Sequence, residues 1–270
     1  MIRVQLGTPP PELTQKGSEE LAKAREHFGN PANKGKQFAF KVYKLPVVKD
    51  ALNEAFHFKC AYCESYFGAT QPLDVEHFRP KSAVLIDGKL KWGLYHWLAM
   101  SWGNLLPSCT DCNRGRRQRL PDGTTITLGK ANQFPIGPET KRAKREGDEK
   151  NEPRLLVHPS LDRPEAHLDF DATDGMVTAK TRKGRESTRV YALLRDGLVR
   201  ARKAMQVEIR THITVARGLA RRLERDGPDP ELEAMLVEEI TALKRYVEPS
   251  HPYSGMARRM VDPVLKELLP

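Results

Sequence analysis

A glutamate and a histidine stand side by side in the stretch "LDVEHFRPKS" (residues 73–82). Apolar and polar residues alternate around them, which is typical of a half-buried strand. The carboxylate of Glu76 is a suitable ligand for a hard divalent cation. The imidazole of His77 accepts a proton near neutral pH, because its unperturbed pKa is about 6.5. A cation ligand beside a base is the pair that metal-assisted hydrolysis requires.

Four cysteines form two pairs, Cys60-x-x-Cys63 and Cys109-x-x-Cys112, separated by 45 residues. Each pair offers two thiolates from one tight turn, and two such turns complete a tetrahedral zinc site. A redox pair or chance spacing is the alternative, but two pairs without a further cysteine favour zinc. Four protein ligands leave no open position for substrate, so the sequence predicts a structural zinc that joins two distant segments.

The segments around these residues resemble the HNH endonuclease family. The resemblance rests on "CAYC…DVEHFRPKS…WGNLLPSCTDCNRGRR", because the strand–strand–helix metal motif of that family is often supported by a zinc site of two CxxC pairs. It is closest to the Septu PtuB-like and retron-associated nuclease subunits, which share "EHFRPK" and a segment like "YSGMARR" near the C-terminus. The likeness is strong over residues 59–117 and loose over residues 150–270.

The resemblance implies a role for each of four residues in phosphodiester hydrolysis. His77 would be the general base, and Glu76 would bind a catalytic divalent cation. Asn113 would supply a carbonyl oxygen as the second protein ligand, and Asn104 would hold the loop that carries His77. The chain departs from the commoner family pattern by having Glu76 in place of an aspartate and Asn113 in place of a second histidine. Because an amide oxygen is a weak ligand for transition metals, these residues predict Mg²⁺ or Mn²⁺.

The balance of charge favours a polyanionic partner. The chain has 45 Lys and Arg against 35 Asp and Glu, a net charge of +10. This excess is typical of proteins that bind nucleic acid, and it predicts DNA as the substrate together with the family resemblance. The basic residues that flank the candidate site are the expected phosphate contacts, with a solvated basic surface as the alternative: Arg79, Lys81, Arg114, Arg116 and Arg117.

The elements that position these residues can be read from periodicity. Residues 11–28, 47–58 and 92–100 are expected to be helical, residues 74–78 to form a strand, and the second cysteine pair to lead into another helix. Beyond Ser187, apolar residues from Val190 to Met205 recur at three- and four-residue steps, as one buried helical stripe would. In "GPDPELEAMLVEEITALKRYV" the aspartate before the second proline is a good N-cap, and a last helix is expected from Ser254.

These elements predict an α+β fold: a strand–strand–helix nuclease unit stapled by the zinc, with helices on either side of it in the chain. We expect an N-terminal helical segment (residues 1–58), the nuclease core (59–125), a loop-rich connection (126–186) and a helical partner-docking domain (187–270). The first residues, "MIRVQLGTPPPELTQ", lack the apolar core of a signal peptide, and no run reaches the roughly 18 apolar residues of a membrane span. The sequence therefore predicts a cytoplasmic protein with reduced cysteines.

The resulting functional hypothesis is an HNH endonuclease that acts as the effector of an antiphage defence system with an ATPase partner (PtuA-like). A stand-alone restriction-type nuclease is one alternative, and a zinc module that only binds nucleic acid is another. The intact set of Glu76, His77, Asn104 and Asn113 argues against the second alternative. Apolar stripes without a recognisable DNA-reading motif in residues 187–268 favour partner docking over the first.

Overall fold

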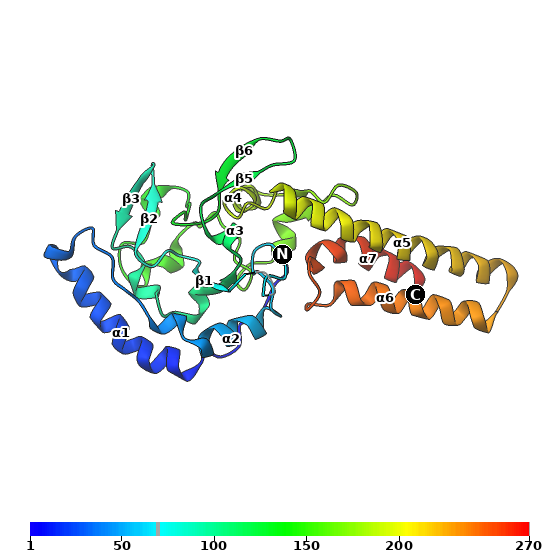
Figure 1. Cartoon of the computed structure of the whole chain (residues 1–270), viewed down its shortest axis with the longest axis horizontal. Helices are drawn as coiled ribbons and strands as arrows, with labels where there is room; N and C mark the ends of the chain where they lie inside the picture. The colour runs from blue at the N-terminus through cyan, green and yellow to red at the C-terminus, as the bar shows by residue number, and fades with distance from the viewer. Residues whose placement is uncertain (69–70, 270) are drawn as a thin grey trace.

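The computed structural model describes residues 1–68 and 71–269, which form a mixed α/β body and a helical arm that projects from it (Figure 1). Within these residues there are seven α-helices and four two-stranded sheets. The helices are α1 (Pro11–Gly29), α2 (Pro46–Ala55), α3 (Thr110–Asn113), α4 (Arg182–Val190), α5 (Asp196–Asp226), α6 (Pro230–Val247) and α7 (Ser254–Leu268). The strands are β1 (Asp74–His77), β2 (Ala83–Ile86), β3 (Lys89–Trp92), β4 (Leu105–Ser108), β5 (Arg116–Arg119), β6 (Thr125–Leu128), β7 (Leu168–Phe170) and β8 (Val177–Ala179). The predicted combination of helices and strands in one chain is confirmed.

Two strands and a short helix bring the two halves of the candidate site together. β1 and β4 pair antiparallel, with Asp74 opposite Ser108 and His77 opposite Leu105. Cys109 is the N-cap of α3 and Cys112 lies within this helix, so the chain passes from β4 directly into the helix that carries the second cysteine pair. The strand that carries His77 therefore lies beside the segment that ends at Asn113.

The two faces of β4 belong to different hydrophobic clusters. Leu105 packs with Leu13 of α1 and Leu52 of α2, whereas Leu106 packs in the large core that contains the four cysteines and Phe134. Successive residues of a strand point to opposite faces, so this alternation is what an apolar strand between two layers requires. The N-terminal helices thus cover one side of the β1–β4 pair and fix its position in the body.

Three helices form the arm (Figure 1). α5 runs for 31 residues, with Gly227 as its C-cap. α6 begins as expected, with Asp229 Oδ1 accepting hydrogen bonds from the backbone N–H groups of Glu231 (3.0 Å) and Leu232 (3.2 Å). α7 starts at Ser254, as predicted, and is continuous through Pro263. The arm has its own apolar core, which includes Met205, Ile209, Leu243, Met256 and Val261. No helix in the described part of the chain, α5 included, is long and apolar enough to cross a membrane.

Three local predictions are wrong. Residues 92–100 do not form a helix: Trp92 ends β3, and only His96–Leu98 form a 3₁₀ turn, because Gly93 (φ +80°) and Tyr95 (φ +56°) reverse the chain. The helix expected after the second cysteine pair is instead a single turn, α3, which contains Cys112, and the chain then enters the β5–β6 hairpin. The apolar stripe from Val190 to Met205 is divided between α4 and α5, because Ala192 lies between them in a left-handed conformation (φ +53°).

The segment between β6 and α4 contributes to the body of the protein. It contains β7 and β8, and it supplies Phe134, Leu156 and Val157 to the large core. Lys130 of this segment is fully buried and reaches the β1 strand. A part of the chain with few regular elements therefore helps to build the site.

Candidate active site and metal centre

A pocket of about 790 Å³ opens beside β1 and the end of α3. Residues 37–40 and Tyr43, which precede α2, also line it. Five residues singled out from the sequence lie in its wall: Glu76, His77, Lys81, Asn113 and Arg114. The structure thus gathers a carboxylate, an imidazole and an amide, with two cationic side chains, around one open space.

His77 is held with one ring nitrogen bonded and the other available. The ring is buried, and Nε2 lies 3.0 Å from the carbonyl oxygen of Ala99. Because a carbonyl only accepts, this contact assigns the proton of the neutral imidazole to Nε2 and leaves Nδ1 as the acceptor. Tyr43 packs edge-on against the ring, with centroids 4.6 Å apart. Burial, reinforced by the charge of Lys81, lowers the pKa of His77 well below 6.5, so the ring is neutral at physiological pH.

Glu76 faces a buried lysine. Its Oε1 lies 2.5 Å from Lys130 Nζ, without an aligned hydrogen bond, and the same Nζ donates to the carbonyl oxygen of His77 at 2.9 Å. Burial raises the pKa of Glu76 above its usual value, and the charges of Lys130 and Lys81 oppose that rise. Lys130 therefore contacts both the candidate cation ligand and the backbone of the candidate base.

Asn104 ties together the loop that follows β1. Its Oδ1 accepts from the backbone N–H of Arg79 at 2.8 Å, and its Nδ2 donates to the carbonyls of Arg79 (3.1 Å) and Leu98 (3.2 Å). The side chain is buried outside the residues that line the pocket. These three bonds fix the backbone immediately after His77, so Asn104 is placed to position this segment and not to contact a substrate.

Asn113 approaches the pocket from the end of α3. Its Nδ2 donates to Asp74 Oδ2 at 3.1 Å, which leaves the amide oxygen as the atom available to a cation. Asp74 also accepts two bonds of 2.8 Å from the guanidinium of Arg114. This arrangement fixes the orientation of the Asn113 amide through a β1 residue.

The five basic residues expected at phosphates differ in their placement. Lys81 and Arg114 line the pocket. Arg116 is exposed and pairs with Asp111. Arg117, also on β5, lines a second pocket together with Cys109 and Arg195. Arg79 lies outside the residues that line the pocket, and its guanidinium bonds Glu152 (2.8 Å) and the carbonyl of Glu149 (2.9 Å). This guanidinium, whose side chain is 11% exposed, is therefore paired within the body.

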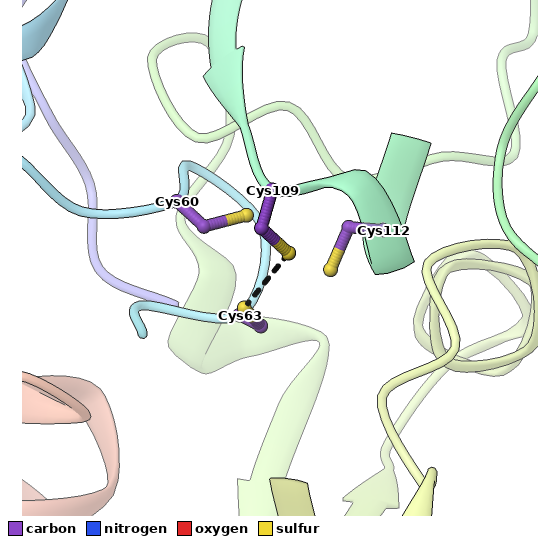
Figure 2. Close-up of side chains that lie close together, drawn as sticks. All are labelled: Cys60, Cys63, Cys109 and Cys112. Atoms are coloured by element: carbon purple, nitrogen blue, oxygen red, sulfur yellow. Dashed lines mark hydrogen bonds between the residues drawn. The ribbon is translucent and has the colours of Figure 1, made fainter. Parts of the chain in front are cut away.

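The four cysteines form one buried cluster (Figure 2). Their Sγ atoms all lie within 4.8 Å of one another, and Cys63 Sγ is 3.8 Å from Cys109 Sγ. Four sulfurs placed 2.3 Å from a tetrahedral ion are separated by about 3.8 Å, so the donor set and its size fit zinc. None of the four is in a disulfide. The cluster can hold a metal such as zinc, as the spacing predicts.

Three residues at these sites carry no signal that the sequence analysis used. Lys130 lies in "GKANQF" and Tyr43 in "KVYKLP", and neither stretch matches a ligand or catalytic pattern. Arg195, whose guanidinium reaches the cysteines, stands in "LLRDGL" 83 residues after Cys112. Contacts across such distances depend on the tertiary fold, so local spacing does not reveal them.

Comparison with known proteins places the chain in a family. It is 35% identical over 288 aligned residues to Septu protein PtuB of Bacillus mycoides (strain KBAB4), which covers 99% of this chain and 92% of that protein. It is 29% identical over 159 residues to Septu protein PtuB of Bacillus thuringiensis (58% and 43%) and 31% identical over 171 residues to Septu protein PtuA of Bacillus mycoides (62% and 22%). No family model matches the chain. The extent of the first match shows that the chain belongs to the Septu PtuB family.

Proposed function

We propose that this protein is a metal-dependent HNH endonuclease that hydrolyses DNA phosphodiester bonds, as the effector of an antiphage defence system. The observation that carries the proposal is the pocket in which Glu76, His77 and Asn113 lie together. Glu76 and His77 stand on β1, which pairs antiparallel with β4, and Asn113 ends the short helix that follows β4. This order of elements supports the proposed HNH metal motif. A protein that only binds nucleic acid has no need of a buried neutral imidazole beside a carboxylate.

His77 is proposed to take the proton from the attacking water. Nδ1 is the basic nitrogen of the ring, because Nε2 faces the carbonyl of Ala99. The same carbonyl stabilises the imidazolium that forms when the proton is transferred, since it accepts a charge-assisted hydrogen bond. The lowered pKa of His77 keeps the base unprotonated at neutral pH, and Asn104 and Tyr43 restrict the movement of the ring and its backbone.

Glu76 and Asn113 are proposed to hold the catalytic cation, Mg²⁺ or Mn²⁺. A carboxylate and an amide oxygen are hard donors, which suits these ions, and both residues line the same pocket. A divalent cation bound there supplies positive charge to the scissile phosphate. Lys81 and Arg114 lie in the same wall and are proposed to contact the phosphates on either side of the cleaved bond.

The arm is proposed to dock a PtuA-like ATPase subunit. A Septu PtuA contains a stretch similar to this chain, which supports an association between the two kinds of protein. The arm projects from the body and carries exposed apolar side chains on both long helices, Val207 on α5 and Val237 on α6. Exposed apolar residues on an extended helical pair are typical of a surface that packs against another protein.

The activity is tested on the chain purified with its PtuA-like partner. Plasmid DNA and single-stranded RNA are incubated with the complex after chelation and restoration of either zinc alone or zinc with Mg²⁺ or Mn²⁺. We expect DNA cleavage only in the second case, because the cysteine cluster offers no open position to substrate. Binding is measured separately by mobility shift. DNA binding without cleavage under every metal condition would favour the zinc-module alternative and contradict the nuclease.

Docking is tested by charge substitutions on the arm. Residues 187–190 belong to α4 and pack in the body, so deletion from residue 187 damages more than the arm. Val207→Lys and Val237→Lys replace side chains that are 51% and 62% exposed. We expect each to weaken co-purification with the PtuA-like subunit at least tenfold without a change in melting temperature. Leu161→Lys, at a 58% exposed residue of the body, is the matched control. Normal co-purification of both arm variants would place the docking surface elsewhere on the chain, whereas failure of the wild-type protein to co-purify would support a stand-alone nuclease.

A further inference from the structure

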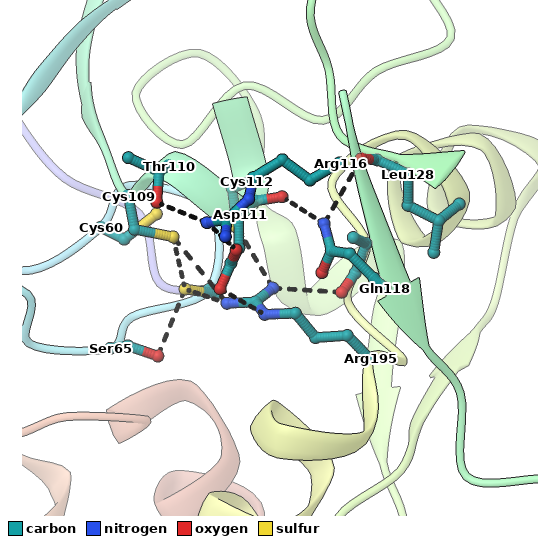
Figure 3. Close-up of polar contacts among 12 residues, drawn as sticks. Cys60, Ser65, Cys109, Thr110, Asp111, Cys112, Arg116, Gln118, Leu128 and Arg195 are labelled. Atoms are coloured by element: carbon teal, nitrogen blue, oxygen red, sulfur yellow. Dashed lines mark hydrogen bonds and ion pairs between the residues drawn. The ribbon is translucent and has the colours of Figure 1, made fainter. Parts of the chain in front are cut away.

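The start of the arm touches the cysteine cluster through one arginine. Arg195 is the N-cap residue of α5, and its guanidinium points at the sulfurs (Figure 3). Nη1 donates to Cys112 Sγ and Nη2 donates to Cys63 Sγ, both at 3.4 Å, and Nη2 is 3.8 Å from Cys109 Sγ. One planar cation therefore contacts both cysteine pairs.

The charge of Arg195 matches what the cluster needs. A zinc ion bound by four thiolates leaves two thiolate charges uncompensated. All four cysteines are buried, and an uncompensated buried charge is costly. Arg195 is itself only 9% exposed, and its remaining polar contacts are the carbonyl of Ala192 (3.1 Å) and a carboxylate oxygen of Asp111 (3.8 Å). The sulfurs are thus the principal source of negative charge around this guanidinium.

The start of α7, where the arm returns to the body, contacts the segment of the first cysteine pair. Ser65 Oγ lies 3.3 Å from Cys63 Sγ and 3.1 Å from the hydroxyl of Tyr253, the residue before α7. The adjacent Glu64 accepts a hydrogen bond from Ser254 Oγ at 3.0 Å. Glu64 and Ser65, which directly follow Cys63, therefore connect the cysteine cluster to the start of α7.

We propose that the four-cysteine site is the joint between the arm and the body, and that Arg195 couples them by balancing the charge of the metal–thiolate group. Binding of the metal and packing of the first turn of α5 against the body then depend on one another. Since Asn113 directly follows Cys112, the joint also borders the pocket. This inference concerns metal binding and the arm, and it does not depend on the proposed nuclease activity.

The first experiment compares Arg195→Gln with Arg195→Lys and with Arg200→Gln. Arg200 is the matched control, because it lies on the same helix with its side chain 72% exposed and pairs with Asp196. Zinc content is measured by elemental analysis, and zinc release is followed with a chromogenic chelator. Residues that contact metal ligands typically contribute 10–100-fold to metal affinity, so we expect Arg195→Gln to release zinc about 10–100-fold faster than wild type. Arg195→Lys keeps the charge and is expected to fall between the two.

The second experiment uses the unaltered protein, so its result does not depend on whether a variant folds. Amide hydrogen exchange is measured with zinc and after its removal by chelator. We expect loss of protection in the first turns of α5, with α1 still protected because it packs in a separate apolar cluster. Zinc-free purified protein, wild-type release from Arg195→Gln, or release from Arg195→Lys as fast as from Arg195→Gln would each overturn the proposal. Equal loss of protection in α1 would overturn it as well, since the metal would then hold the whole fold.

Discussion

Replacing His77 by alanine is expected to lower the rate of DNA cleavage by about 10²–10⁴-fold, the usual effect of losing a general base. The zinc content and DNA binding should stay near wild type, because His77 lies outside the cysteine cluster and its ring is neutral. Cleavage of plasmid DNA is measured with the activating partner present, and binding and melting temperature are measured on the same preparations.

Glu76→Ala should also be inactive, but for a different reason. Loss of a carboxylate ligand weakens binding of the catalytic cation, so excess Mg²⁺ or Mn²⁺ should restore part of the activity. His77→Ala should resist this rescue, because added cation does not replace a proton acceptor. The matched control is His96→Ala, since His96 also bonds a backbone carbonyl (Gly93, 2.9 Å) but lies outside the residues that line the pocket. Wild-type cutting by His77→Ala would refute the mechanism.

The pH dependence of the cleavage rate is an independent test of whether His77 is the general base. A base whose pKa is lowered stays unprotonated at lower pH, so the loss of activity on acidification should occur below 6.5, the ordinary value for histidine. His77→Ala should lose the part of this dependence that belongs to the imidazole, whatever its residual rate.

The features that sequence reasoning located correctly are those encoded by neighbouring residues. The two cysteine pairs, the strand expected at residues 74–78 and observed at Asp74–His77, and the Asp229 cap each depend on spacing within one turn or one strand. The fold brings the two cysteine pairs together because β4 leads directly into the second pair, and its Pro107 carbonyl accepts a hydrogen bond from the backbone N–H of Ala61 in the first pair (2.9 Å). Local patterns therefore sufficed for the four-cysteine cluster and for the strand of the candidate base.

The features that it missed depend on contacts between distant segments. Arg79 stands two residues after the candidate base, yet its partner is Glu152, 73 residues later, and this pairing turns the side chain into the body. The helix expected at residues 92–100 has suitable apolar spacing, but Gly93 and Tyr95 adopt left-handed backbone conformations. Lys130 and Arg195 likewise acquire their roles only through the fold. The role of each of these side chains depends on a partner residue that is distant in the sequence.

Lys130→Met is expected to be strongly destabilising. Lys130 is fully buried, and removing it leaves the Glu76 carboxylate without its ion-pair partner. Breaking a buried ion pair by deleting one member costs about 3–5 kcal/mol in free energy of unfolding, whereas neutralising both members costs much less. The double variant Glu76→Gln/Lys130→Met should therefore be more stable than Lys130→Met alone, as measured by urea unfolding. Lys91→Met, at an exposed lysine of β3, is the control and should unfold like wild type.

The loss in free energy of unfolding caused by Lys130→Met should increase as pH rises. Burial already raises the pKa of Glu76 in the folded protein, and loss of the Lys130 charge raises it further. A folded state that holds a proton more tightly than the unfolded state loses stability as pH rises. The difference between Lys130→Met and wild type should thus be small below the ordinary glutamate pKa of 4.5 and should grow above it. A pH-independent difference would show that packing, and not the charge of Glu76, determines the effect.

Cleavage by Lys130→Met should follow the same ionisation. A protonated Glu76 does not bind a divalent cation, so the variant should need a higher pH and more Mg²⁺ at neutral pH than wild type. At alkaline pH the carboxylate ionises, and the missing lysine charge no longer opposes the cation, so the Mg²⁺ requirement should fall to the wild-type level or below. Simple loss of structure would instead lower the rate equally at every pH. Recovery at alkaline pH therefore distinguishes a lysine that positions and charges Glu76 from one that only fills the core.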